Sequence, residues 1–262
     1  MAGSASDTLA VTHDRLLGGR VLFDQPADGY RASVDAVLLA AAVAALPGQR
    51  VLELGSGAGA TALCLARRVE GCQVTGLERD PQLAALANAN AAANGWADRM
   101  LFVTGDVVEQ HSKVPEGDFD HAFANPPYLE AERADRRGHG ASSDADSARR
   151  RAHLAEIEDA VPLAAWLDRL CRAVRPKGRI ALIQRADRLA DILAGLNGRA
   201  GDIAVLPLWP KAGAPARRVI VSARAGSHAP LRLLAGLVLH DADGAYSAAA
   251  QAILRDCAPL DL

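Results

Sequence analysis

The chain has 262 residues, of which 50% are apolar, and it can therefore bury a sizeable core. Its 29 basic and 31 acidic residues nearly cancel, which excludes the strong overall positive field of many nucleic-acid-binding proteins, so any RNA contact must come from a local patch. No apolar run approaches the roughly 20 residues that cross a bilayer, and the start Met1–Asp7 is unlike a signal peptide, so we expect a soluble, cytoplasmic protein without membrane contact.

The first 49 residues are expected to form an N-terminal element that completes a cofactor and substrate site. Leu22–Tyr30 is turn-rich and β-like, and Ser33–Ala45 has a helical pattern with Ser33 as its N-cap. Residues 50–262 are expected to form the main domain.

Short strand-like segments alternate with helical segments from Arg50 onward. The expected strands are Arg50–Leu54, Gln73–Glu78, Met100–Thr104, Phe119–Ala124 and Arg179–Gln184. The expected helices are Ala60–Val69, Pro81–Asn94, Ile157–Val174 and Asp187–Leu196. This alternation predicts a parallel sheet that is covered by helices on both faces.

Two further strands, near Ile203–Pro207 and at Arg218–Ala223, have no helix between them. Only the Pro- and Gly-containing segment Leu208–Arg217 separates them, which predicts an antiparallel hairpin at the end of the sheet. The expected fold is therefore a doubly wound α/β fold with a mostly parallel, seven-stranded, Rossmann-like sheet and a C-terminal antiparallel hairpin.

Basic residues gather in two places. The segment Glu130–Arg151 contains six arginines and five acids and has almost no large apolar side chain, so we expect a surface loop. Its last arginines, Arg149, Arg150 and Arg151, and a second basic group are candidate RNA contacts. The second group consists of Lys211, Arg217 and Arg218. A loop that is merely solvated is the alternative interpretation of Glu130–Arg151.

Three glycines, Gly55, Gly57 and Gly59, follow the first expected strand of the main domain where a helix should begin. Glycine lets the backbone approach a ligand closely, and a helix start offers free N–H groups. The spacing differs from the GxGxxG of dinucleotide sites, and Glu53 precedes it on the strand. It resembles the motif of class I S-adenosylmethionine-dependent methyltransferases, in which this turn accommodates the amino-acid part of the cofactor.

The same resemblance implies roles for acids at the next strand ends. Glu78 ends the second strand, where the family has an acid that binds both ribose hydroxyls of the cofactor. Asp106 and Val107 follow the third strand, where the family contacts the adenine of the cofactor. Glu53, Glu78 and Asp106 are thus expected to hold S-adenosylmethionine. Negative charge at all three positions also disfavours a phosphate-bearing ligand.

The sequence Asn125-Pro126-Pro127-Tyr128 directly follows the apolar strand Phe119–Ala124. Consecutive prolines restrict the backbone and remove two donors, which leaves carbonyl groups to accept hydrogen bonds. The Asn125 side-chain oxygen and the Pro126 carbonyl can accept the two N–H groups of a planar amine, and Tyr128 can stack on a flat base. The loop has no cysteine, which argues against covalent carbon methylation. The seven histidines are scattered and none has the spacing of metal ligands, so no metal is expected.

Beyond these motifs, the chain resembles the bacterial tRNA(Val) adenine-N6 methyltransferases over nearly its whole length. The similar segments are Tyr30–Leu39, Asn125–Tyr128, Arg151–His153, Leu206–Arg218 and Leu239–Tyr246. The resemblance implies that Asp35 lies near the cofactor and Arg31 near the cofactor carboxylate. It also implies methyl transfer from S-adenosylmethionine to N6 of an adenine in tRNA.

The sequence leaves two other classes of function open, and it also leaves DNA or a small molecule possible as the methyl acceptor. Release-factor glutamine methyltransferases also carry Asn-Pro-Pro-Tyr, and an amide presents the same two hydrogens as an aromatic amine. These enzymes usually have a helical N-terminal domain, whereas only about 50 residues precede the glycine turn here. A catalytically idle S-adenosylmethionine-binding module is the second alternative. The sequence leaves the oligomeric state open between monomer and homodimer.

Overall fold

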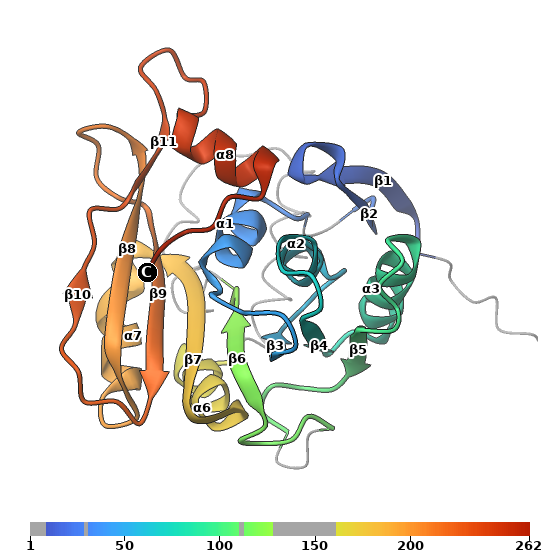
Figure 1. Cartoon of the computed structure of the whole chain (residues 1–262), viewed down its shortest axis with the longest axis horizontal. Coiled ribbons are helices and arrows are strands. Elements are labelled where there is room, and N and C mark those ends of the chain that lie inside the picture. Colours follow the sequence, from blue (N-terminus) through green and yellow to red (C-terminus); the bar gives the residue numbers. More distant parts are fainter. Residues whose placement is uncertain (1–8, 29–30, 110–112, 128–160) are drawn as a thin grey trace, which may run out of the picture.

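The computed structural model describes residues 9–28, 31–109, 113–127 and 161–262. Its centre is a nine-stranded sheet with the order β10-β8-β9-β7-β6-β3-β4-β5, and β11 pairs with the last part of β8 (Figure 1). The strands are β3 Arg50–Leu54, β4 Gln73–Glu78, β5 Met100–Thr104, β6 Phe119–Ala124, β7 Val174–Arg185, β8 Ala200–Lys211, β9 Arg218–Ala225, β10 Arg232–Leu233 and β11 Leu237–His240.

The predicted α/β class and its antiparallel hairpin are confirmed. Strands β3 to β7 pair in parallel, whereas β9 lies antiparallel between β7 and β8. The sheet is wider than the seven strands expected, because the short strands β10 and β11 both add to β8 in parallel. The chain reverses from β3–β4–β5 on one side of β3 to β6 on the other, which makes the gap between β3 and β6 the topological switch point.

Helices cover both faces of the sheet. On one face lie α1 Val34–Ala42, α2 Ala60–Arg68, α3 Pro81–Ala93 and α8 Ala248–Asp256, and on the other lie α6 Leu163–Ala173 and α7 Leu189–Leu196. Ser33 caps α1 as expected, because its side chain accepts the Asp35 N–H at 3.3 Å. Asp80 caps α3, and Pro81 occupies the first turn. None of the helices described has the length and apolar character needed to cross a membrane.

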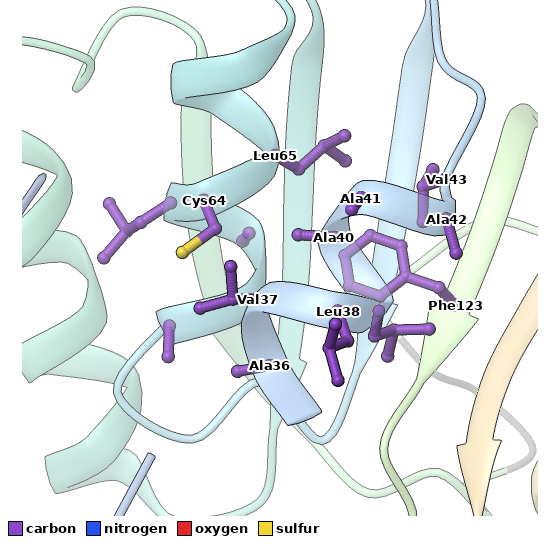
Figure 2. Packing of buried hydrophobic residues seen from close by; sticks show 14 of the residues in the cluster. Ala36, Val37, Leu38, Ala40, Ala41, Ala42, Val43, Cys64, Leu65 and Phe123 are labelled. Atoms are coloured by element: carbon purple, nitrogen blue, oxygen red, sulfur yellow. The ribbon is translucent and has the colours of Figure 1, made fainter. Parts of the chain in front are cut away.

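Alternation along the strands divides the core into two layers. In β3, Val51 belongs to the layer under α1 and α2, whereas Leu52 and Leu54 belong to the layer under α6. Nearly every residue of α1 is buried, because this helix packs against the sheet, α2 and α8. Figure 2 shows α1 between α2, which carries Cys64, and the ring of Phe123 on β6.

The N-terminal segment differs from the single β element expected at Leu22–Tyr30. It forms a two-stranded antiparallel hairpin of β1 Val11–Leu16 and β2 Val21–Pro26. Two asparagines at the C-terminal end of α3 hold β2: the Asn94 side chain accepts the Leu22 N–H and the Asn90 side chain accepts the Asp24 N–H, each at 2.9 Å. The hairpin is thereby fixed beside the helices that follow β3 and β4.

Candidate active site

The register of three neighbouring strands brings the main candidate residues to one edge of the sheet. Leu54 of β3 lies opposite Ala124 of β6 and Leu77 of β4. The next residue on each strand is therefore Gly55, Asn125 or Glu78, and neighbouring strands lie only about 4.8 Å apart. The glycine turn, the predicted ribose acid and the Asn-Pro-Pro loop thus meet at the switch point.

The glycine turn is tightly constrained at Gly55 and open at Gly57. Both residues have positive φ, +66° and +53°. A Cβ at Gly55 would lie 2.7 Å from the Trp166 ring of α6, so only glycine fits there. A Cβ at Gly57 would meet nothing within 4 Å. Gly57 therefore leaves space above the turn where a ligand can approach the backbone, whereas Gly55 and Gly59 shape the turn itself.

Glu53 lies beneath this turn. Its carboxylate is 2% exposed and accepts the Ala62 N–H of α2 at 3.1 Å. Burial raises the pKa of Glu53 to about 8, although hydrogen bonds from Thr61 and Ala62 oppose this shift. The structure therefore shows Glu53 joining β3 to the start of α2, and its contact with the cofactor stays a prediction.

Glu78 faces the glycine turn from the neighbouring strand. Its two carboxylate oxygens accept the Gly57 N–H at 2.7 Å and the Asp80 N–H at 3.0 Å. A carboxylate has about four acceptor positions, so roughly two remain for a ligand. Asp106 lies two residues beyond β5, where its carboxylate accepts the Val108 N–H at 3.1 Å, and Val107 beside it is buried. The three acids thus lie along the carboxyl ends of β3, β4 and β5.

The Asn-Pro-Pro loop is supported by a residue that sequence reasoning missed. Asn125 is half-buried, Pro126 is buried and Pro127 is exposed. Gln184, only 1% exposed near the end of β7, directs its amide Nε2 at the Pro126 and Pro127 carbonyls, 3.4 and 3.5 Å away. Its own Oε1 accepts the Arg185 N–H at 2.9 Å, which fixes the amide orientation. Tyr128 lies outside the described residues.

The N-terminal candidates make other contacts in this structure. Arg31 donates to the Asp14 carboxylate at 2.8 Å and to the Thr12 hydroxyl at 2.9 Å, and so binds the N-terminal hairpin. Asp35 is buried at the start of α1 and forms an ion pair with Arg218 of β9. A predicted cofactor residue and a predicted RNA residue are thus partners, and Arg218 has less freedom to bind RNA than its neighbours.

The other basic candidates divide into two groups. Lys211 ends β8 and Arg217 precedes β9, so both lie at the same edge of the sheet as the Asn-Pro-Pro loop, and both are exposed. Arg149, Arg150 and Arg151, with the rest of the arginine-rich segment, lie outside the described residues.

Comparison with known proteins supports the architecture and identifies the family. A model described as "Methyltransferase domain" matches residues 51–138. Among solved structures, a predicted O-methyltransferase from Agrobacterium tumefaciens has a TM-score of 0.69 at 24% identity and covers 87% of this chain and 98% of its own. A tRNA (m1A58) methyltransferase from Aquifex aeolicus has a TM-score of 0.53 at 16% identity and covers 78% and 73%. Both show the class I methyltransferase fold.

Three similar sequences share one name, tRNA1(Val) (adenine(37)-N6)-methyltransferase. The protein from Aeromonas hydrophila is 31% identical, with 83% of this chain and 85% of the relative aligned. The protein from Dickeya chrysanthemi is 30% identical, with 86% and 87% aligned. A Porphyromonas gingivalis relative is 34% identical, and the aligned part spans 64% of each chain. This chain belongs to the family of bacterial tRNA1(Val) (adenine(37)-N6)-methyltransferases.

Proposed function

We propose that this protein transfers a methyl group from S-adenosylmethionine to N6 of an adenine in tRNA. The observation that carries the proposal is the strand register, which aligns Ala124 of β6 with Leu54 of β3. The amine-accepting loop and the glycine turn therefore adjoin at the switch point, where α/β sheets bind their ligands. A methyl donor on the turn and an acceptor on the loop would be neighbours.

The residues present fit S-adenosylmethionine. Gly57 leaves open space over the turn, and Glu78 retains acceptor capacity for two ribose hydroxyls beside it. Asp106 follows the next strand, where its carboxylate would accept a hydrogen bond from the adenine amino group of the cofactor. When bound, the cofactor supplies an electrophilic methyl group on a sulfonium. Carboxylates at these strand ends suit its positive charge better than they would suit a dinucleotide's phosphates.

The loop provides positioning for the acceptor. The Asn125 side-chain oxygen and the Pro126 carbonyl would accept the two N–H groups of the adenine amine and turn its lone pair toward the methyl carbon. The new N–C bond forms as the C–S bond breaks, with the electron pair going to sulfur, and one amine proton passes to solvent. Because amide oxygens are weak bases, orientation supplies most of the rate enhancement. Tyr128 is the proposed stacking partner of the target base.

Two observations favour RNA as the carrier of that adenine. The relatives that align over most of their length are named as tRNA methyltransferases. Lys211 and Arg217 also place positive charge at the edge where the loop lies. We assign residues 1–49 to completing this site, because Asp35 of α1 reaches Arg218 beside it. A cytoplasmic location, where tRNA is modified, follows from the same proposal.

Substitution of Asn125 tests the chemistry. Asn125→Ala should reduce turnover by at least about 100-fold, because the amine is no longer oriented. The dissociation constant of S-adenosylmethionine should stay near the wild-type value, since the cofactor contacts lie on β3, β4 and β5. Asn197→Ala, at an exposed asparagine after α7, is the matched control and should retain full turnover. Wild-type turnover by Asn125→Ala would contradict the assigned role.

A further inference from the structure

A rigid aromatic pair stands on the hairpin that follows β11. The His240 and Tyr246 rings are stacked, with centroids 4.6 Å apart and planes inclined by 24°. The turn between them is held by the Asp241 N–H bonded to the Ala245 carbonyl at 2.9 Å and by the Gly244 N–H bonded to the Asp241 carbonyl at 3.0 Å. Tyr246 is 36% exposed, so the stack presents aromatic surface to solvent on a fixed backbone.

Strand register places this pair at the edge that carries the candidate active site. His240 lies opposite Lys211, the last residue of β8, and β11 runs parallel to β8. Figure 1 shows β8, β9, β7 and β6 side by side in that order. At about 4.8 Å per strand, β8 is roughly 14 Å from β6, and β11 is roughly 19 Å from it.

Some of the basic side chains at this edge of the sheet are paired with carboxylates, and others are not. Arg218 and Arg185 are paired with Asp35 and Asp187. Exposed Lys211 and Arg217, by contrast, form no ion pair with any residue in the described part of the chain. The hairpin turn carries two acids, Asp241 and Asp243, and the Asp243 carboxylate is bonded to the Ala245 N–H at 2.9 Å. An anionic partner would therefore find two available cations and an aromatic face, with little net attraction at long range.

We propose that the His240–Tyr246 stack binds an unpaired base of the RNA substrate, with Lys211 and Arg217 holding adjacent phosphates. Every base has a flat π-face, so an aromatic pair captures a single-stranded nucleotide without reading its identity. The distance of roughly 14 to 19 Å from β6 exceeds the step of about 3.4 Å between stacked nucleotides. The bound base is therefore not the methylated adenine but a nucleotide several positions away or across a splayed loop. This inference rests on the proposed function and names a second contact of the same RNA.

Steady-state methylation of tRNA that lacks the modification tests whether the His240–Tyr246 stack binds a base. Tyr246→Ala should raise the KM for tRNA by roughly 5- to 150-fold, the range measured when stacking on one base is lost. Both kcat and the affinity for S-adenosylmethionine should stay within about twofold of wild type. Tyr246→Phe keeps the ring and should restore the wild-type KM. That rescue separates stacking from a hydrogen bond of the phenol.

A second variant tests the same footprint without altering the stack. Lys211→Ala/Arg217→Ala should reduce the slope of log binding constant against log salt by about 1.4, since each single-stranded phosphate contact contributes about 0.7. Arg67→Ala is the matched control, because this exposed arginine lies in the last turn of α2, away from the glycine turn where that helix begins. Its salt slope should equal that of the wild type.

The outcomes distinguish the two proposals. Suppose that the wild-type enzyme methylates tRNA, but Tyr246→Ala has an unchanged KM and the double variant has an unchanged salt slope. The proposed role of the His240–Tyr246 stack would then be wrong, whereas the proposed function would stand. If the wild-type enzyme binds S-adenosylmethionine but methylates only a protein amide, both the proposed function and the proposed role of the stack are wrong. A raised KM in Tyr246→Ala that Tyr246→Phe fails to restore also overturns the stacking role.

Discussion

The buried acid under the glycine turn makes stability depend on pH in an unusual direction. The pKa of Glu53 rises from 4.5 to about 8 because burial penalises the carboxylate. The folded protein therefore binds this proton more tightly than the unfolded chain does. The stabilisation is complete below about pH 4.5 and is lost as pH rises toward 8, at about 1.4 kcal/mol per unit.

A buried histidine opposes this effect at lower pH. Burial lowers the pKa of His121 from 6.5 to about 4, so the folded state loses stability as pH falls below 6.5. The contributions of Glu53 and His121 to the slope of unfolding free energy against pH cancel between about pH 4.5 and 6.5. Above pH 6.5 only the contribution of Glu53 remains. Burial also raises the pKa of Cys64 and Cys72 above the usual value of 9, so neither thiol ionises in the folded protein between pH 6.5 and 8. The net loss expected from pH 6.5 to 8 is about 1 kcal/mol, because folded Glu53 is half-ionised at pH 8 and the unfolded histidine is half-protonated at pH 6.5.

Urea unfolding of the wild type and of Glu53→Gln at pH 6.5, 7.2 and 8 measures this difference. Glutamine keeps an oxygen that can accept the Ala62 N–H but cannot ionise. The wild type should lose about 1 kcal/mol of unfolding free energy across the range, and the unfolding free energy of the variant should stay nearly constant. Parallel curves for the two proteins would refute the assignment of a proton to buried Glu53.

Three further substitutions probe the site. Gln184→Met removes the donor to the Pro126 carbonyl and should lower kcat by about tenfold at unchanged affinity for S-adenosylmethionine, and an unchanged kcat would exclude a positioning role. Glu78→Ala should weaken cofactor binding by about 1.5–3 kcal/mol in calorimetry, because a charged acceptor is lost, and equal affinity would remove Glu78 from the ribose site. Asp35→Ala removes the carboxylate that pairs with the Arg218 guanidinium, which is only 25% exposed. This loss should reduce the unfolding free energy by about 3 kcal/mol. Arg218→Met in the same chain should recover part of that loss, and independent effects in a double-mutant cycle would contradict the pairing.

Positions fixed by strand order were predictable from the sequence. Strands that alternate with helices form a parallel sheet, and their carboxyl ends share one edge. Glu78 and Asn125 each end or follow such a strand, so their proximity to the glycine turn follows from chain order. The helix start at Ser33 and the antiparallel pairing of β8 with β9 were likewise encoded in local residues.

Contacts between distant segments were not predictable in this way. Asp35 and Arg218 are 183 positions apart, and nothing in either local sequence specifies the other. Gln184 resembles an ordinary polar residue at a strand end, and only the β6–β7 register brings it to the Pro126 carbonyl. The strand β10 has two residues, too few to show an alternating pattern. Tertiary packing decides such features.

Methyl transfer to RNA is the direct measure of the proposed activity. Total tRNA from cells that lack the modification would be incubated with the enzyme and labelled S-adenosylmethionine, with a release-factor protein in a parallel reaction. We expect label in N6-methyladenosine of a tRNA and none in the protein. Label only in a glutamine of the protein, or no label in either acceptor while the cofactor is bound, would contradict the proposed activity.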